Sequence, residues 1–239
     1  MRDLLMPKEH WCQMFCYLDD HISYVDSLFP EIIANQGEDS RGAKRAYLTQ
    51  FASHISYQNT LYSAGSPLEE IREIYPKTVD LFRRVWDKSF GYVQMVWMLS
   101  IGIMLDIDKK YIVELAELVK RDELHDYLVD FLLHYVDVSW PVDGTDFQFD
   151  VPYKELYAVI NAQSPESARS LLKEYLEKKW YRGHRDTSWY NDHTDKNSLH
   201  DGYWSYESGA IAKILGLDNA DWENLKYYPY DMVHYSNHA

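Results

Sequence analysis

Seven side chains that could bind a metal ion or transfer a proton lie within eighteen residues of the C-terminal half. They are His184, Asp186, Asp192, His193, Asp195, His200 and Asp201. Such groups can hold a catalytic divalent cation, so a metal-dependent hydrolase is one interpretation. Their spacing is irregular, without the i, i+4 repeat that places two ligands on one helical face, and these residue types are also common in solvated loops. We predict a solvated or partner-facing loop and keep the hydrolase as the alternative.

Other catalytic patterns are incomplete. His184-Arg185-Asp186 matches the catalytic-loop tripeptide of protein kinases, but no glycine-rich loop, strand lysine or Asp-Phe-Gly segment accompanies it. Walker A, Gly-x-Ser-x-Gly and Gly-x-Gly-x-x-Gly motifs are also missing, and only 10 glycines argue against a nucleotide-binding α/β fold. We therefore expect a protein that is not an enzyme and that needs neither a cofactor nor a metal.

The two cysteines, Cys12 and Cys16, are four residues apart, so they lie one turn apart on the same helical face. A zinc site would need further thiolates or histidines at matching spacing, which His10 and His21 do not supply. We expect two small buried thiols in a reducing compartment.

The clearest charge pattern is an acidic run over residues 122–150, which holds eight acidic residues and no Lys or Arg. The eight are Asp122, Glu123, Asp126, Asp130, Asp137, Asp143, Asp146 and Asp150. Asp122, Asp126 and Asp130 are four residues apart, so a helix over residues 122–136 would align them in one stripe on its surface. Like charges at that spacing destabilise a helix. A helix N-terminus explains the first turn only, whereas a surface that meets Lys and Arg explains the whole run.

The net charge of −14 is uneven along the chain. Residues 1–120 carry −4 and residues 121–239 carry −10, so the second half repels nucleic acid and attracts a basic protein surface. The longest apolar run, residues 90–107, is too interrupted to span a membrane, and the N-terminal sequence has no signal-peptide pattern. We expect a cytoplasmic protein that binds neither nucleic acid nor a membrane.

The elements that position these residues are predicted to be helices, because apolar residues recur at helical spacing and strict alternation is rare. Ser66, Pro67 and Glu69 form a helix start signal, as do Ser164, Pro165 and Glu166. The expected helices cover residues 8–28, 43–62, from 66 onward, 90–107, 109–119, 122–136, 153–161, 164–179 and 203–215, with a short one from 218 or 219. Loops are expected at 137–151 and 181–202, and residues 227–231 are expected to be extended or turn-like.

Aromatic residues are concentrated in the last quarter of the chain. Most of them are expected in the core, since Tyr203, Trp204 and Tyr206 lead into the apolar helix at 203–215. Trp189 and Tyr190 fall in the expected loop, so we predict that they anchor a partner.

The C-terminal residues resemble the PoNi immunity protein family. The resemblance rests on Trp189-Tyr190, Gly202-Tyr203-Trp204-Ser205-Tyr206-Glu207, Ala210, Ala212, Leu215, Tyr228-Pro229 and Asp231, and more loosely on Tyr62-Ser63-Ala64-Gly65 and Pro67-Leu68-Glu69-Glu70. Within the motif, we interpret Gly202, Tyr203, Trp204, Glu207, Tyr228, Pro229 and Asp231 as structural. Tyr203 and Trp204 would form a buried aromatic pair, and Glu207 would favour a helix N-terminus.

The helical spacing predicts about ten helices, with an N-terminal helical domain (1–107) packed on a C-terminal immunity domain of stacked helical hairpins (108–239), and the resemblance likewise implies an all-α protein in two parts. It also implies a bacterial immunity protein that binds and blocks a cognate DNase toxin, often one delivered by a type VI secretion apparatus. The acidic run, Trp189 and Tyr190 are the expected contact residues. The alternatives are the metal-dependent hydrolase and a helical adaptor for another basic protein.

Overall fold

The computed structural model describes residues 1–195 and 199–236, which are helical and contain no β-strand, so the all-α prediction is confirmed. The chain divides into two compact units. The first unit comprises Met1–Trp86 and Asn191–Tyr203, and the second comprises Asp87–Tyr190 and Trp204–Ala239. This division differs from the boundary expected after residue 107 in two ways: residues 87–107 belong to the second unit, and Asn191–Tyr203 belongs with the N-terminal helices.

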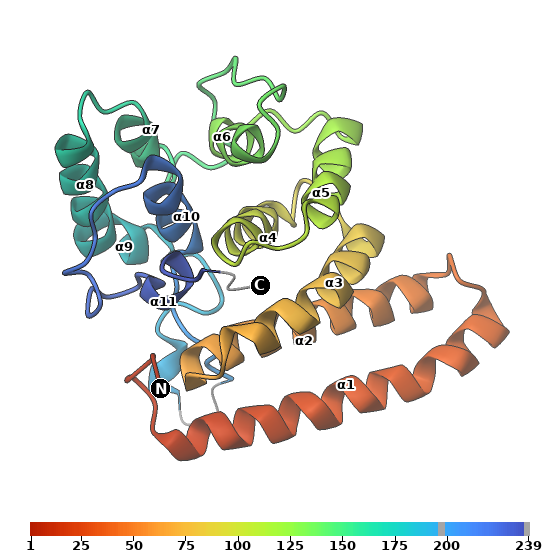
Figure 1. Ribbon diagram of the computed structural model, residues 1–239. Coiled ribbons are helices and arrows are strands. Elements are labelled where there is room, and N and C mark those ends of the chain that lie inside the picture. Colours follow the sequence, from red (N-terminus) through yellow and green to blue (C-terminus); the bar gives the residue numbers. More distant parts are fainter. Residues whose placement is uncertain (196–198, 237–239) are drawn as a thin grey trace. The chain divides into compact units, whose positions relative to one another are not determined.

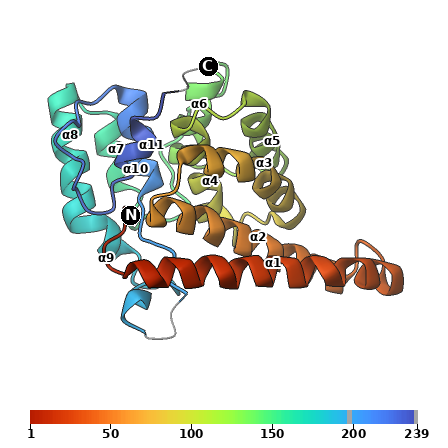
Figure 2. The ribbon, with the colours of Figure 1, turned by 60° about the horizontal axis from the view of Figure 1, so that its bottom comes forward.

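The first unit is built on three long helices that pack in sequence order: α1 (Lys8–Gln36), α2 (Arg41–Ala64) and α3 (Leu68–Val85) (Figures 1 and 2). Buried residues such as Leu18, Phe51 and Ile71 fill the space between them. The expected end of α1 near residue 28 is wrong, since the helix continues through Pro30. The proline ring removes one backbone hydrogen bond without ending a helix that is packed along its length on α2.

The turn from α2 to α3 uses Gly65, whose φ of +89° gives the left-handed conformation that glycine adopts without strain. The helix α3 begins at Leu68, with Pro67 at its N-cap and no side-chain cap. The capping role expected for Ser66 is therefore wrong. By contrast, the side chain of Ser164 accepts a hydrogen bond of 3.2 Å from the backbone of Ser167, which confirms the second predicted cap.

The second unit surrounds α4 (Tyr92–Met104), which contacts α5, α6, α10 and α11 and is almost entirely buried, as its apolar sequence predicts. Its other elements are α5 (Lys109–Arg121), α6 (Tyr127–Val136), α7 (Glu155–Ile160), α8 (Pro165–Glu174), the π-helix η1 (Tyr175–Trp180), α9 (Tyr181–Gly183), α10 (Tyr206–Leu215) and α11 (Tyr230–Val233). Figure 1 shows α8 continuing directly toward α9. No helix in the described parts of the chain is long and apolar enough to cross a membrane.

Three further expectations need correction. Residues 217–229 form turns, so no helix opens at 218 or 219, and the short helix α11 occupies part of the tail expected to be extended. The cysteines Cys12 and Cys16 are exposed on α1 and not buried. Their shared face points to solvent because α2 covers the opposite face, which carries Trp11, Met14 and Leu18.

Candidate partner-binding surface

The buried side chain of Asp126 connects the start of α6 to the loop at 137–150. Its carboxylate accepts hydrogen bonds from the backbone N–H of Val129 at 2.9 Å and of Gln148 at 2.8 Å. The first bond caps α6 and the second fixes the far end of the loop at 137–150. Burial raises the pKa of Asp126, although the two N–H donors act in the opposite direction. With 1% of its surface exposed, Asp126 does not fit the partner-contact role expected for it.

The expected acidic stripe does not form, because α5 ends at Arg121 and α6 begins only at Tyr127. Asp122 ends α5 and forms an ion pair with Arg121. The carboxylate of Asp130 accepts a hydrogen bond of 2.9 Å from the indole of Trp140, and burial raises its pKa. Asp122 and Asp130 are therefore engaged in local contacts, and the like-charge repulsion expected along one helix face does not arise.

Two more acidic residues belong to turns. Asp137 accepts hydrogen bonds from the backbone and hydroxyl of Ser139, which lower its pKa. Glu123 is exposed with a φ of +49°, in the turn between α5 and α6. Glu123 is thus accessible to a partner, while Asp137 mainly shapes the start of the loop.

Besides Glu123, the accessible acids of the run are Asp143, Asp146 and Asp150, all exposed on the loop at 137–150, which we call the acidic loop. The backbone carbonyl of Asp146 accepts a hydrogen bond of 2.8 Å from Tyr127, so the loop is tied to the start of α6. Two apolar side chains, Val138 and Phe149, are also exposed on it. Exposed carboxylates beside exposed apolar groups suit contact with a basic protein surface.

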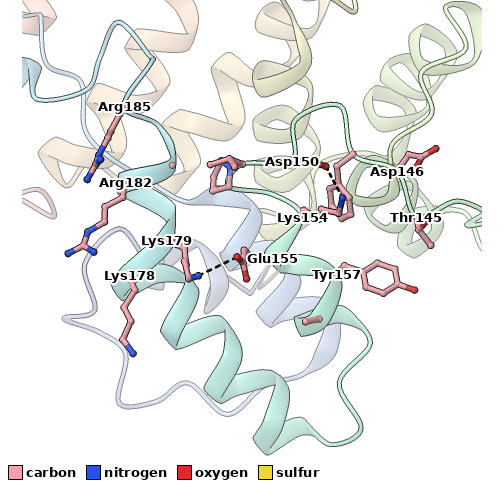
Figure 3. A pocket seen from close by; sticks show the side chains of 15 residues that line it. Thr145, Asp146, Asp150, Lys154, Glu155, Tyr157, Lys178, Lys179, Arg182 and Arg185 are labelled. Atoms are coloured by element: carbon pink, nitrogen blue, oxygen red, sulfur yellow. Dashed lines mark hydrogen bonds and ion pairs between the residues drawn. The ribbon is translucent and has the colours of Figure 1, made fainter.

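One end of the acidic loop borders a pocket of about 970 Å³ within the second unit. Figure 3 shows Lys178, Lys179, Arg182 and Arg185 along η1, α9 and the turn that follows, while Asp146, Asp150 and Lys154 lie on the other side, and Glu155 pairs with Lys179. The acids are Asp146, Asp150 and Glu155, and the cations are Lys154, Lys178, Lys179, Arg182 and Arg185. The sequence interpretation missed these cations, although residues 178–185 contain four basic residues and no acidic one.

Trp189 and Tyr190, expected as free anchors, are packed on the second unit. The ring of Trp189 stacks on Trp180 with a centroid distance of 5.8 Å and also contacts His184 at 5.0 Å. Tyr190 stacks on Tyr181 at 4.6 Å. Both side chains are half-buried, so at least part of their role is structural.

The family-like motif separates into two environments. Tyr203 is buried in the first unit, where its hydroxyl donates a hydrogen bond of 2.6 Å to Asp192, and Gly202 before it has a φ of +119°. Trp204 starts the next part of the second unit and is only half-buried. The expected buried aromatic pair is therefore wrong, although Tyr203 itself lies in a core.

Glu207 occupies the first turn of α10 and is fully buried. It accepts hydrogen bonds from Ser205 at 2.7 Å and Tyr175 at 3.3 Å, and burial raises its pKa to about 7. Near the end of the motif, Tyr228 is buried and accepts a hydrogen bond from Asn219. Pro229 stands at the N-cap of α11 and Asp231 in its first turn, so these residues shape the C-terminal helix.

The seven potential metal ligands do not form one site. His184 and Asp186 belong to the second unit, whereas Asp192, His193, Asp195, His200 and Asp201 belong to the first. His184 is buried, its Nδ1 bonded to the Trp180 carbonyl and its Nε2 to the Tyr153 hydroxyl, and burial lowers its pKa. Within residues 1–195 and 199–236, no three His, Cys, Asp or Glu side chains are arranged to hold a metal ion.

In the first unit, His200 is the partner of two of the nearby carboxylates. Its Nδ1 lies 2.6 Å from Asp192 and its Nε2 lies 3.0 Å from Asp3. The two carboxylates outweigh burial and raise the pKa of His200 to about 9, so the imidazole is charged at neutral pH. An imidazolium with both nitrogens engaged in this way cannot bind a metal ion.

Family models match nearly the whole chain. Residues 2–117 match the model for the N-terminal part of PoNe immunity proteins (PoNi), and residues 124–232 match the model for the C-terminal part. The chain belongs to the PoNi immunity protein family. Both parts match, so the family likeness extends well beyond the C-terminal motif on which the sequence resemblance mainly rested.

A crystal structure of the protein PA2201 from Pseudomonas aeruginosa has the same fold, with a TM-score of 0.67. The two chains are 20% identical, and the match covers 95% of this PoNi chain and 86% of the other chain. At this identity the likeness concerns the fold alone. No curated protein matches the chain.

Proposed function

We propose that this PoNi protein binds a cognate basic DNase toxin and neutralises it by charge-complementary contact, without chemistry of its own. The acidic loop is the observation that carries the proposal. It exposes Asp143, Asp146 and Asp150 beside apolar side chains, and hydrogen bonds to α6 and its N-cap hold its backbone at Asp146 and Gln148. A preordered loop loses less conformational entropy when it binds.

The expected partner has the complementary charge. A nuclease must attract the phosphate backbone of DNA, so it presents Lys and Arg around its substrate channel. A net charge of −14, with −10 in the last 119 residues, attracts such a surface and repels DNA itself. Electrostatic attraction of this kind acts mainly on the association rate.

Delivery of the toxin between bacteria, often by a type VI secretion apparatus, and a cytoplasmic location for the PoNi protein are part of the same proposal. The metal-dependent hydrolase finds no support in the geometry around His184 and His200. An adaptor for some other basic protein differs from the proposal in one observable way, because it would not protect cells from the toxin.

The experiment reverses the three accessible charges in the variant Asp143→Lys, Asp146→Lys and Asp150→Lys. The probe is a catalytically inactive nuclease domain of the toxin encoded beside the PoNi gene. We expect the association rate to fall by about tenfold or more at low salt. The melting temperature should change little, because all three side chains are exposed.

A matched control carries Asp20→Lys, Glu31→Lys and Asp39→Lys, which alters the net charge equally at exposed positions of the first unit. A smaller effect in this control would show that position matters and not only total charge. If the acidic-loop variant associates with the toxin at the wild-type rate, the acidic loop is not part of the interface. Absence of any binding or protection by the wild-type protein would reject the proposed function.

A further inference from the structure

Of the five cations that line the pocket, three form ion pairs with carboxylates of the protein. Lys179 pairs with Glu155 at 3.3 Å, Lys154 with Asp150 at 3.2 Å, and Lys178 with Glu174 at 3.3 Å. Arg182 and Arg185 also line the pocket, and neither forms an ion pair with any residue that the structure describes. Arg182 and Arg185 are both exposed and three residues apart, and guanidinium groups can bind carboxylates in a bidentate manner.

The pocket walls are held together by close packing. A Cβ atom on Gly183 would lie 2.5 Å from the Cβ atom of Pro152, so the segment with the two arginines approaches the end of the acidic loop as closely as a glycine permits. The ion pair between Lys179 and Glu155 joins the same segment to α7 (Figure 3). Arg182 and Arg185 therefore lie along one edge of a pocket whose walls are packed together.

Between the charged walls lie apolar groups that a ligand could cover. Val151, Tyr157 and Ala158 line the pocket and are exposed. Val151 leaves 69% of its surface accessible, an unusual exposure for an apolar side chain in the middle of a lining. The pocket thus offers cationic, apolar and anionic groups to one occupant.

We propose that this pocket binds a segment of the partner protein that carries both signs of charge. The carboxylates of the segment would bind Arg182 and Arg185, a Lys or Arg would face Asp146 and Asp150, and an apolar side chain would cover Val151. This inference rests on the proposed function, because it takes the toxin as the partner. The inference adds a contact made by cations of the PoNi protein to an interface that, from the net charge, would be expected to use only its acidic residues.

A nucleic acid fits the pocket less well than a protein segment. Phosphates would meet Asp146 and Asp150 at the same opening, and the whole protein repels a polyanion before contact. A peptide can present both charges within a few residues, so it satisfies both walls. The test therefore includes DNA as a competing ligand.

The first variant is Arg182→Glu with Arg185→Glu, and its matched control is Arg41→Glu with Lys44→Glu. Both pairs are exposed, three residues apart and change the net charge equally, but Arg41 and Lys44 lie at the start of α2. The inactive nuclease domain is again the probe. We expect at least about tenfold weaker binding for the pocket variant, mostly through faster dissociation, and little weakening for the control.

The second variant, Ala158→Trp, fills the pocket without changing its charge. Ala158 is exposed on α7, so a larger side chain there should be compatible with folding, which circular dichroism and a thermal melt would verify. We expect it to weaken toxin binding to a similar extent. Agreement of the two variants would show that the cavity itself is occupied.

Two results would overturn the inference. One is wild-type affinity for the toxin in both folded pocket variants while the acidic-loop variant is weakened, which would leave the proposed function intact. The other is binding of a short DNA duplex that depends on Arg182 and Arg185. If the wild-type protein does not bind the toxin at all, the proposed function fails first.

Discussion

At the residue scale, Asp126 and Asp143 show that identical side chains in one acidic run have different tasks. Asp126 is buried and accepts backbone hydrogen bonds from Val129 and Gln148. Asp143 is exposed on the acidic loop. Removing the first should therefore affect folding, and removing the second should affect only the interaction with a partner.

We expect Asp126→Ala to lower the free energy of unfolding by about 2–4 kcal/mol, because α6 loses its cap and two N–H groups lose their acceptor. Chemical denaturation would measure the change. The companion variant Asp143→Ala should stay within about 0.5 kcal/mol of the wild type. Equal stability of Asp126→Ala and the wild type would show that the loop is anchored by other contacts.

At the element scale, the helical segment from α8 through η1 to α9 provides both the basic side of the pocket and the support for Trp189. The π-helical turn at Tyr175–Trp180 lies in the middle of this segment and presents Trp180, which Trp189 covers. The segment from α8 through η1 to α9 therefore packs against Trp189 and also supplies cations to the pocket. This double role explains why the aromatic residues there are poor candidates for free anchors.

Trp189→Ala should lower the free energy of unfolding by about 1–3 kcal/mol, since a half-buried ring stacked on Trp180 and His184 is lost. A thermal melt would detect this loss. The conservative variant Trp189→Phe should recover part of it, because a smaller ring can still stack. An unchanged melting temperature for the alanine variant would contradict the structural role and favour the original prediction that Trp189 anchors a partner.

At the scale of the whole molecule, the chain leaves the second unit after Tyr190, contributes Asn191–Tyr203 to the first unit, and returns at Trp204. His200 holds the segment Asn191–Tyr203 in the first unit, because it pairs with Asp3 near the N-terminus and with Asp192 of the same segment. His10 also contacts it, through the backbone carbonyl of His200. The charged imidazole therefore helps to hold the segment that contains His200 against the N-terminal residues of the first unit.

This arrangement predicts a pH dependence of stability. The folded pKa of His200, about 9, lies above its ordinary value of 6.5, so its stabilising contribution is complete below about pH 6.5 and is lost as the pH rises to about 9. The loss should amount to roughly 3 kcal/mol at most. Denaturation curves across this range should show a weaker pH dependence for His200→Gln than for the wild type. Parallel curves for the two proteins would contradict it.

Helical periodicity and acidity could be read from the sequence because they are properties of local order and composition. The spacing of apolar residues predicts most of the helices, the Ser164 cap is a local signal, and the net charge needs no coordinates. The motif around Tyr203 and Glu207 likewise identifies the family without contact information. In each case the physical cause acts between residues that are close in sequence.

Tertiary structure alone decided which of these residues remain accessible. Asp126 is hidden because Gln148, 22 positions away, donates to it, and Arg182 lies at a pocket because Gly183 packs on Pro152. His200 is a charged structural residue because Asp3, 197 positions away, lies beside it. Such pairings depend on where distant segments meet, and the energy of a buried or paired charge is set by those neighbours and not by the residue type.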